Sequence, residues 1–400
     1  MSGRILIVGA GANQVGIIEK ARALGLFTIA MDGNPCAPGF AVADAYAAAN
    51  ILDPHEIVRL AETHGAGGIY PAAELAVEAA AQAAAQLDLP GPGPEVATCV
   101  RNKLAMRRAL DSAGLPNPAY RGVRTLDEAR RAVAEIGFPV IVKPIDGNAS
   151  KGVRRVDTEE DLPGTFEKAL ERSRSNAVLI EAFMEGEEFN VDGLVHEGAY
   201  ILGGITAKDR SVPPNRFDLG IYMPPLESAD TLFLVADTVA DALGAIGFRN
   251  GTTHAEVIVS PEGPHIVEIA GRPGGGRIPT DLIPLTYGTD FMADSLRIAL
   301  GHPPIERRRH ERGTAVYWIP ADPGTVVSIE GVDEARAVLG VEDIVIAIRR
   351  GDRVEPIIDC VTRDRIGYVM TAADTVEDAI AAAKRARDLC RIITQPASDA

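Results

Sequence analysis

The stretch His254–Arg272, HAEVIVSPEGPHIVEIAGR, decides how this chain is interpreted. Two alternating, β-branched runs flank the cluster SPEGP, whose Pro and Gly residues are typical of a chain reversal, so we predict a β-hairpin. If residues 260–264 form a loop centred on Glu262, then Glu256 lies directly opposite Glu268. Facing side chains of an antiparallel pair are about 5 Å apart, where like charges repel. Such a pair is tolerable if one carboxyl is protonated or if a cation lies between the two.

The two glutamates are candidate metal ligands. Carboxylates are hard oxygen ligands of the kind that Mg²⁺ prefers, and Mg²⁺ usually also binds phosphate oxygens and water. We therefore expect Mg²⁺, with Mn²⁺ as an alternative, at Glu256 and Glu268. The next turn, GRPGGGR, carries Arg272 and Arg277, whose guanidinium groups could hold a phosphoryl group or a carboxylate. The alternative is an edge hairpin with both glutamates in solvent.

A second candidate site lies in FPVIVKPIDGNASKGV, which predicts a buried strand ending near Lys143. The ammonium group must be solvated or paired there, because burying an unpaired charge is costly. The following loop contains Gly147, Ser150 and Gly152, which suit a backbone cradle for phosphate. The spacing is not that of a Walker motif. The alternative is a lysine at a surface edge beside a hairpin loop.

The segment LIEAFMEGEEFNVDG places four glutamates among apolar and aromatic residues. In an adenosine site, a carboxylate accepts hydrogen bonds from ribose hydroxyls while the base lies among apolar side chains. We select Glu188 for the ribose. For most of these acids, a solvated strand–turn–strand is the simpler interpretation.

Length and composition limit the classes of protein to consider. A chain of 400 residues predicts two to four domains, and a net charge of −16 argues against general affinity for nucleic acid or an anionic membrane surface. No apolar run is long enough to span a membrane and no signal peptide is evident, so we expect a cytoplasmic protein. Four cysteines stand singly and are expected to be reduced.

Residues 1–90 alternate strand and helix signals, which predicts βαβα units on a parallel sheet. Their glycine turn, GAGANQVG, fits a dinucleotide motif at Gly9 and Gly11, but Gln14 occupies the third glycine position. Asp32 ends the second strand, where a ribose-binding acid would stand. A nicotinamide site and a turn without a ligand are equally compatible with this pattern. Residues 313–395 mix strands and helices and carry no motif that we can assign.

Taken in order, the helix NKLAMRRAL, the FPVIVKP strand with its loop, LIEAFMEGEE and the paired glutamates resemble the ATP-grasp superfamily of carboxylate–amine ligases. The resemblance covers roughly the first three quarters of the chain. It implies an α/β N-terminal parallel-sheet domain, then α+β ATP-grasp subdomains and a small mixed α/β C-terminal unit. We place these parts at residues 1–95, 96–180, 181–305 and 306–400.

The resemblance also implies roles for individual residues. Glu256 and Glu268 would ligate Mg²⁺. Arg272 would face the transferring phosphate, as in the branch of the family that ligates amino acids, with Lys208 and Arg277 as further catalytic candidates. The residues assigned to ATP are Lys103 and Lys143, the loop residues Gly147, Ser150, Lys151 and Gly152, Glu181 with the backbone of Ala182 and Met184 at the adenine, and Glu188 at the ribose.

Two positions depart from the family pattern. Ala270 stands two residues after the second metal glutamate, where many members carry Asn. Ile221 stands where related enzymes often have His after Gly, in a segment that resembles the loop lining the substrate side. Lys208 and Arg210 in that segment are candidates for the surroundings of an acyl phosphate, against a basic, solvated loop as the alternative.

We therefore predict an ATP-dependent ligase that forms an amide or peptide bond through an acyl phosphate. An amino acid or related small carboxylate is the favoured substrate, small molecules are the only partners expected, and a homodimer is expected by resemblance. The alternatives are a purine-pathway or biotin-carboxylase-like ATP-grasp enzyme, a nicotinamide-dependent oxidoreductase, and a non-catalytic nucleotide-binding protein of the same fold.

Overall fold

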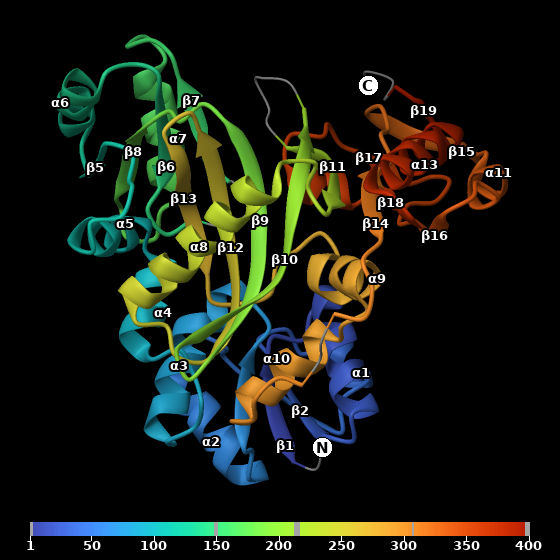
Figure 1. Cartoon of the computed structure of the whole chain (residues 1–400), viewed down its shortest axis with the longest axis horizontal. Helices are drawn as coiled ribbons and strands as arrows, with labels where there is room; N and C mark the ends of the chain where they lie inside the picture. Colours follow the sequence, from blue (N-terminus) through green and yellow to red (C-terminus); the bar gives the residue numbers. More distant parts are fainter. Residues whose placement is uncertain (1–2, 148–150, 212–216, 306–307, 397–400) are drawn as a thin grey trace.

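The computed structural model describes residues 3–147, 151–211, 217–305 and 308–396. Within these ranges the strands form four sheets (Figure 1). The N-terminal unit lies at the bottom of Figure 1, a small sheet at the upper left and the C-terminal segment at the right, with the long strands of the largest sheet between them. The predicted fold class is confirmed.

The N-terminal unit is a parallel sheet in the order β3-β2-β1-β4, as predicted. Its helix ends follow local signals: the Asp53 side chain caps α2, and Gly65 ends that helix in the left-handed conformation. The elements are β1 (Arg4–Val8), α1 (Val15–Ala23), β2 (Phe27–Asp32), β3 (Ala45–Ala48), α2 (Pro54–His64), β4 (Gly68–Pro71) and α3 (Val77–Gln86), with short 3₁₀ turns η1 (Ala12–Gln14), η2 (Pro38–Ala41) and η3 (Glu74–Ala76).

The glycine turn after β1 is held by the protein itself. Asp32 accepts a hydrogen bond from the Ala10 amide at 2.8 Å, so this carboxylate fixes the turn. Gly9 has a φ of 107°, and a Cβ there would lie 2.7 Å from the Cβ of Ala73. Gly9 is thus required by conformation and by close packing, without reference to a ligand.

The small sheet is antiparallel, in the order β5-β8-β6-β7. Apolar side chains of α6 and α7 pack on one of its faces, and α6 begins with a capping box formed by Thr125 and Glu128. The elements are α4 (Pro94–Arg101), α5 (Lys103–Ser112), β5 (Tyr120–Val123), α6 (Leu126–Ile136), β6 (Val140–Pro144), β7 (Arg154–Val156), α7 (Leu162–Arg172) and β8 (Val178–Ala182).

The largest sheet has eight strands in the order β13-β12-β9-β10-β11-β14-β18-β16. Side chains alternate between its faces, so Phe189, Ile205 and Ala255 pack under α8, whereas Glu188 and Lys208 lie on the opposite face. The elements up to residue 299 are β9 (Glu187–His196), β10 (Ala199–Arg210), β11 (Asp218–Met223), α8 (Ala229–Ile246), β12 (Gly251–Ser260), β13 (Gly263–Ala270), the π-helical turn η4 (Ile278–Leu282), α9 (Ile283–Tyr287) and α10 (Phe291–Ala299).

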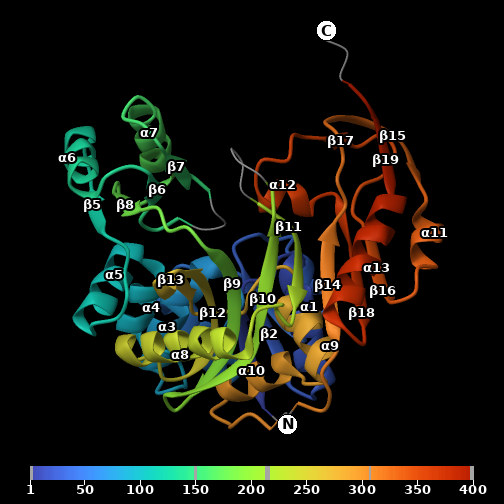
Figure 2. The same ribbon diagram turned by 45° about the horizontal axis from the view of Figure 1, so that its top comes forward.

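The C-terminal segment continues the largest sheet. Its strand β14 pairs with β11, and β18 and β16 follow in that order, while β17, β15 and β19 form a separate small sheet. Helix α13 packs on β14 and β18 (Figure 2). The elements are β14 (Gly313–Trp318), β15 (Gly324–Glu330), α11 (Val332–Arg336), β16 (Val341–Ile346), β17 (Arg353–Val354), α12 (Cys360–Asp364), β18 (Gly367–Ala373), α13 (Val376–Leu389) and β19 (Arg391–Gln395). Across the described ranges, no helix is both long and apolar enough to cross a membrane.

The hairpin β12–β13 pairs Glu256 with Glu268, as predicted. The predicted loop is wrong, however, because the strands reverse at residues 261–262 and Ser260 pairs with Gly263. The register shifts after Glu256, which leaves Val267 as an extra residue in β13, a β-bulge. The predicted loop was too wide, and the bulge was not predicted. These two errors compensate each other in the strand register, so the two glutamates face each other as predicted.

Candidate active site

The two facing glutamates each have a lysine partner. Glu256 lies 2.9 Å from the ammonium of Lys208, and Glu268 lies 3.0 Å from that of Lys103. The charge of Lys208 holds the pKa of Glu256 well below its ordinary value, so this carboxylate is ionised at neutral pH. Two opposed carboxylates are tolerated on one ribbon because a cation reaches each of them.

Lys103 brings three predicted parts of the site together. Its ammonium donates to the carbonyl of Gly147 at 2.9 Å while it pairs with Glu268. Helix α5, the loop after β6 and strand β13 therefore meet at one buried cation. Gly147 is the first residue of the predicted glycine loop, so Lys103 links two motifs that were predicted separately.

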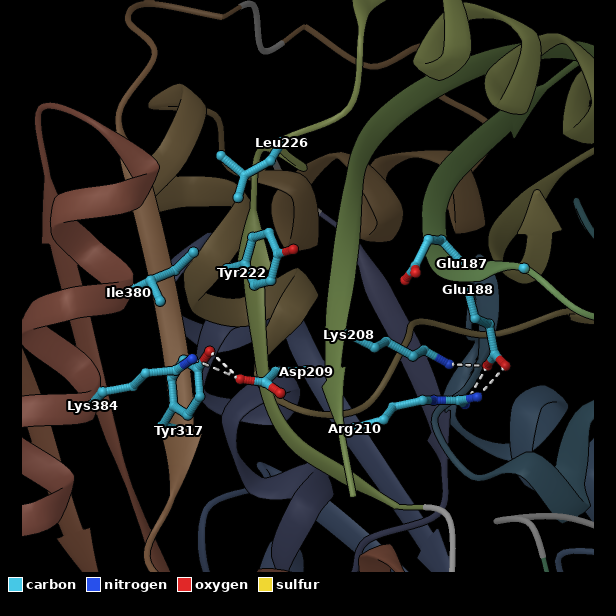
Figure 3. Close-up of a pocket in the computed structure, with 11 residues that line it drawn as sticks. Glu187, Glu188, Lys208, Asp209, Arg210, Tyr222, Leu226, Tyr317, Ile380 and Lys384 are labelled. Carbon is cyan, nitrogen blue, oxygen red and sulfur yellow. Dashed lines mark hydrogen bonds and ion pairs between the residues drawn. The ribbon is translucent and has the colours of Figure 1, made fainter. Parts of the chain in front are cut away.

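Glu188 joins the same network from β9. Its carboxylate accepts from Lys208 at 2.6 Å and from both terminal nitrogens of Arg210 at 2.5 and 2.6 Å (Figure 3). Burial lowers the pKa of Lys208, but Glu188 and Glu256 outweigh burial and raise it above the ordinary value. The predicted ribose residue is thus held by two of the predicted basic residues.

Glu181 forms a separate, closed centre. One of its oxygens lies 2.6 Å from Arg107 and the other lies 2.6 Å from Lys143, and its side chain is only 4% exposed. Burial alone would raise the pKa of Glu181, but Arg107 and Lys143 lower it to about 2. The strand-end lysine is therefore paired, and the carboxylate of Glu181 has no free oxygen for a ligand in this arrangement.

The other residues assigned to ATP surround β6 and β8. The Ala182 amide donates to the Ala119 carbonyl at 2.8 Å, so only its own carbonyl is left to contact an adenine amino group. Met184 follows in the loop between β8 and β9 and is half-buried. Gly152 has a φ of 77° and Lys151 beside it is exposed, whereas Ser150 lies outside the described residues.

Arg272 is held by the N-terminal unit. Its guanidinium pairs with Glu74, which follows β4 and also lies 2.6 Å from Arg101. Burial would raise the pKa of Glu74, but the two arginines outweigh it and lower the pKa. Arg277 instead pairs with Asp281 at 2.9 Å, one helical turn along the chain, and the structure does not bring it to Arg272.

The turn that carries Arg272 is anchored to the large sheet. The Gly274 amide donates to Asp192 at 2.9 Å, and a Cβ at Gly274 would lie 2.5 Å from the same carboxylate. Asp192 also contacts the His254 ring at 3.1 Å. His254 therefore has a structural partner.

The acidic pair suits a magnesium ion bound together with phosphate. Among the described residues, no group of three or more His, Cys, Asp or Glu side chains gathers as a complete metal cage. Glu256 and Glu268 would supply two oxygen ligands, and phosphate and water oxygens would complete the coordination, which is the usual way in which Mg²⁺ is bound. The residues fit this ion without further protein ligands.

The sequence interpretation missed Arg107, Glu74 and Arg101. Arg107 stands one helical turn after Lys103, so the two share a helix face, and that spacing was a usable signal. Glu74 follows a parallel strand at its carboxyl end, where ligand-binding residues collect in α/β sheets. Arg101 offered no comparable signal.

The sequence of this chain is similar to those of known proteins. Residues 136–281 match the model of the ATP-grasp domain, and residues 317–395 match that of L-amino acid ligase C-terminal domain 2. The formate-dependent phosphoribosylglycinamide formyltransferase of Bacillus subtilis is 26% identical, over 97% of this chain and 98% of its own.

Solved structures share the fold. The L-amino acid ligase from Bacillus licheniformis has a TM-score of 0.85 at 24% identity, covering 98% of this chain and 99% of its own. The biotin carboxylase domain of Hydrogenobacter thermophilus 2-oxoglutarate carboxylase, solved with MgADP and bicarbonate, has a TM-score of 0.76 at 21% identity, covering 98% and 90%. Residues 136–281 thus match the ATP-grasp domain, which confirms the predicted resemblance and the predicted ligase class.

Proposed function

We propose that this chain joins a carboxylate to an amine through an acyl phosphate, with ATP as the phosphoryl donor. The observation that carries the proposal is the double contact of Lys103 with Gly147 and Glu268, at 2.9 and 3.0 Å. It places the glycine loop, which would hold ATP phosphates, beside the acidic pair, which would hold Mg²⁺. When bound, Mg²⁺ would neutralise charge that develops on the phosphates.

In the first step, a carboxylate oxygen of the substrate attacks the γ-phosphorus of ATP. The bond from that phosphorus to the bridging oxygen breaks, which yields an acyl phosphate and ADP. The chain's part in this step is positioning and charge neutralisation, which supply most of the catalysis of phosphoryl transfer. We assign these tasks to Lys103 at the glycine loop, to Lys208 beside Glu256 and to Arg272 beyond Glu268.

In the second step, the amine nitrogen attacks the acyl carbon, the carbon–oxygen bond to phosphate breaks, and the nitrogen loses a proton as the amide forms. Phosphate leaves as the second product. Arg272 is the candidate to bind the departing phosphate, because Glu74 and Asp192 hold its side chain and its turn in place. Arg277, which Asp281 holds at 2.9 Å, stays a second candidate for this task.

An amino acid is the proposed carboxylate substrate. The C-terminal match to an L-amino acid ligase domain over residues 317–395 supports this choice, as does an arginine four residues beyond Glu268. Ile221 is 98% buried on the face that carries Lys208, at the position where related enzymes often have histidine. We therefore expect a substrate pocket more apolar than that of histidine-bearing relatives.

A second candidate is a purine-pathway reaction with formate. It is favoured by the similarity to the Bacillus subtilis formyltransferase, which extends over nearly the whole of both chains. Formate would take the place of the amino acid in the first step, and a phosphoribosylated amine would attack in the second. A carboxylase reaction with bicarbonate is the corresponding third arrangement.

Phosphate release separates these candidates. The protein is mixed with ATP and Mg²⁺, and phosphate is followed with pooled amino acids, with formate plus glycinamide ribonucleotide, or with bicarbonate. We expect amino acids to raise the rate at least about tenfold over ATP alone, and mass spectrometry to detect a dipeptide. A response to formate or bicarbonate alone would select the rival reaction. ATP binding without release in any mixture would refute the ligase reaction.

We further propose that the chain works as a cytoplasmic homodimer. The biotin carboxylase domain with which it shares its fold was solved as a dimer, which supports this assembly. Sedimentation velocity at micromolar concentration tests it, since a single species of 42.3 kDa would refute the dimer.

A further inference from the structure

Strands β9 and β10 separate at one end of the largest sheet. The last pair that they form is Phe189 with Ala207. Beyond it, β9 stays paired with β12 as far as Glu187, and β10 stays paired with β11 as far as Arg210. A cavity of about 440 Å³ lies at this split (Figure 3). Its volume is within the range of about 300–1,000 Å³ that is typical of small-molecule sites.

The C-terminal segment closes the cavity on the face of the sheet away from Glu256. Asp209, Gly220 and Tyr317 form one row across β10, β11 and β14. A Cβ at Gly220 would lie 2.5 Å from the Tyr317 ring, so the ring crosses the glycine and its hydroxyl reaches Asp209 at 2.8 Å. The remaining apolar wall consists of Tyr222, Leu226 and Ile380.

The cavity wall carries three acidic and three basic side chains, but in the described part of the chain neither Glu187 nor the nearby Glu227 is paired with any of these bases. Burial raises the pKa of Tyr222, and the charges of Glu227, Glu187 and Asp209 raise it further. Asp209 is compensated by Lys384 at 2.9 Å. Glu187 and Glu227 have no ion-pair partner among the described residues, and one oxygen of Glu227 is buried without a hydrogen bond.

These features complement an organic cation. A buried carboxylate oxygen without a donor is costly, and a cation relieves the repulsion between neighbouring acids. Aromatic rings attract an ammonium group and also cover an apolar substituent. In Figure 3 the Tyr222 hydroxyl points toward the side of the cavity on which the Glu187 carboxylate lies, with strand β10 passing between the two in this view.

We propose that this cavity binds a small organic ammonium ion, with its charge near Glu187 and Glu227 and its apolar part against Tyr222, Tyr317 and Ile380. The cavity adjoins the proposed active site, since Glu188, Lys208 and Arg210 also line it. The ammonium subsite lies on the opposite face of the sheet from Lys208, where the side chains of Asp209 and Tyr222 project. The proposal concerns binding and does not depend on the proposed ligase reaction.

The cavity borders the network around Glu188 directly, because Glu188, Lys208 and Arg210 are among its lining residues. Asp209 lines the cavity, while its neighbours Lys208 and Arg210 hold Glu188 on the other face. A ligand that shifts Asp209 therefore shifts the backbone between these two cations. The C-terminal segment reaches the proposed active site by this route, which gives it a role beyond packing.

Isothermal titration calorimetry of the full chain with phenethylamine tests the site, with 2-phenylethanol as the neutral isostere and saturating ATP and Mg²⁺ present to occupy the nucleotide site. We expect saturable binding of one amine per chain, with the alcohol at least about tenfold weaker. The double substitution Glu187→Gln and Glu227→Gln should weaken the amine at least about tenfold. The matched control, Glu334→Gln with Glu377→Gln, changes the net charge equally at two exposed acids and should bind normally.

A cavity-filling substitution, Ile380→Trp, provides the second variant. It leaves both acids in place and should abolish amine binding, with circular dichroism confirming the fold. The proposal is overturned if the wild-type chain does not bind phenethylamine, if the alcohol binds equally well, or if the control weakens binding as much as the double substitution. Unchanged binding by folded Ile380→Trp would overturn it as well.

Discussion

Glu181 and Glu188 lie on consecutive strands of two different sheets, and both were assigned to the nucleotide, yet their surroundings differ. Glu181 has one cation on each oxygen and is almost fully buried. Glu188 shares Lys208 with Glu256 and lies at the rim of a cavity. The first centre is complete within the protein, whereas in the second one lysine serves two carboxylates. We therefore expect the centre around Glu181 to contribute mainly to stability, and the centre around Glu188 to have charge available for a ligand.

This contrast predicts the largest effect for Glu181→Gln. The substitution leaves Arg107 and Lys143 buried without their anion, which typically costs about 3–5 kcal/mol of unfolding free energy. Urea denaturation followed by circular dichroism measures the loss. Glu185→Gln, at an exposed glutamate in the next loop, is the control and should change stability by less than about 0.5 kcal/mol. Equal losses in the two variants would remove the distinction between the centres.

Lys208→Met should act on activity instead. The shared lysine is assigned to neutralising phosphate charge, and loss of one such group lowers kcat on the order of 10²–10³-fold. Phosphate release in the substrate mixture that proves active is the measurement. Lys168→Met, at an exposed lysine of α7, should keep full activity. If Lys208→Met keeps its activity but is less stable than the wild-type chain, this network serves the fold rather than catalysis.

The two centres should also separate in their response to acid. The pKa of Glu181 is lowered from 4.5 to about 2, so its stabilisation is fully present above about pH 4.5 and is lost as the pH falls toward 2. The shift corresponds to about 3 kcal/mol. Urea denaturation of the wild-type chain between pH 5 and pH 2 should show this loss, and Glu181→Gln should lack it. Parallel pH profiles for the two chains would contradict the assignment.

Arg210→Lys tests the ribose assignment of Glu188 with a smaller effect. Lysine cannot make the two-pronged contact of Arg210, so Glu188 should lose its orientation while the charge is kept. We expect the KM for ATP to rise about tenfold, with kcat within about twofold. A fall in kcat at unchanged KM would move Arg210 from nucleotide binding to the transfer step.

The smallest predicted effect belongs to Tyr317→Phe. The substitution removes one hydrogen bond to Asp209, worth about 1 kcal/mol, and retains the ring over Gly220. Thermal denaturation should show a slightly lower midpoint. Tyr46→Phe, at a tyrosine that is 61% exposed, serves as the control and should leave the midpoint unchanged.

Much of the fold was predictable because it follows local patterns. Alternating apolar runs gave the parallel N-terminal sheet, and β-branched runs around a turn gave the pairing of Glu256 with Glu268. The contact of Lys103 with Glu268 was only implied, through a shared phosphate ligand. The four-part division of the chain stays a prediction.

Other contacts could not be predicted, since they join segments that are far apart in the sequence. Glu74 and Arg272 are separated by 198 residues, and no spacing rule connects them. The C-terminal segment gave no motif, yet Tyr317 and Lys384 reach Asp209 next to the candidate site. Packing, rather than any local pattern, determines such partners.

The bulge at Val267 affects how helix α5 is held against strand β13. If this residue were deleted, the remaining ladder would run without interruption from the turn, and Glu268 would still oppose Glu256. The insertion is therefore dispensable for lining up the acids. The bulge instead affects the backbone carbonyls of the edge strand β13. Arg107 donates hydrogen bonds to the carbonyls of Ile266 and Val267 at 2.5 and 3.2 Å. Through Glu181 of β8 and these two carbonyls of β13, Arg107 links helix α5 to both of the sheets that would enclose the nucleotide. The bulge supplies the two carbonyls that this guanidinium binds.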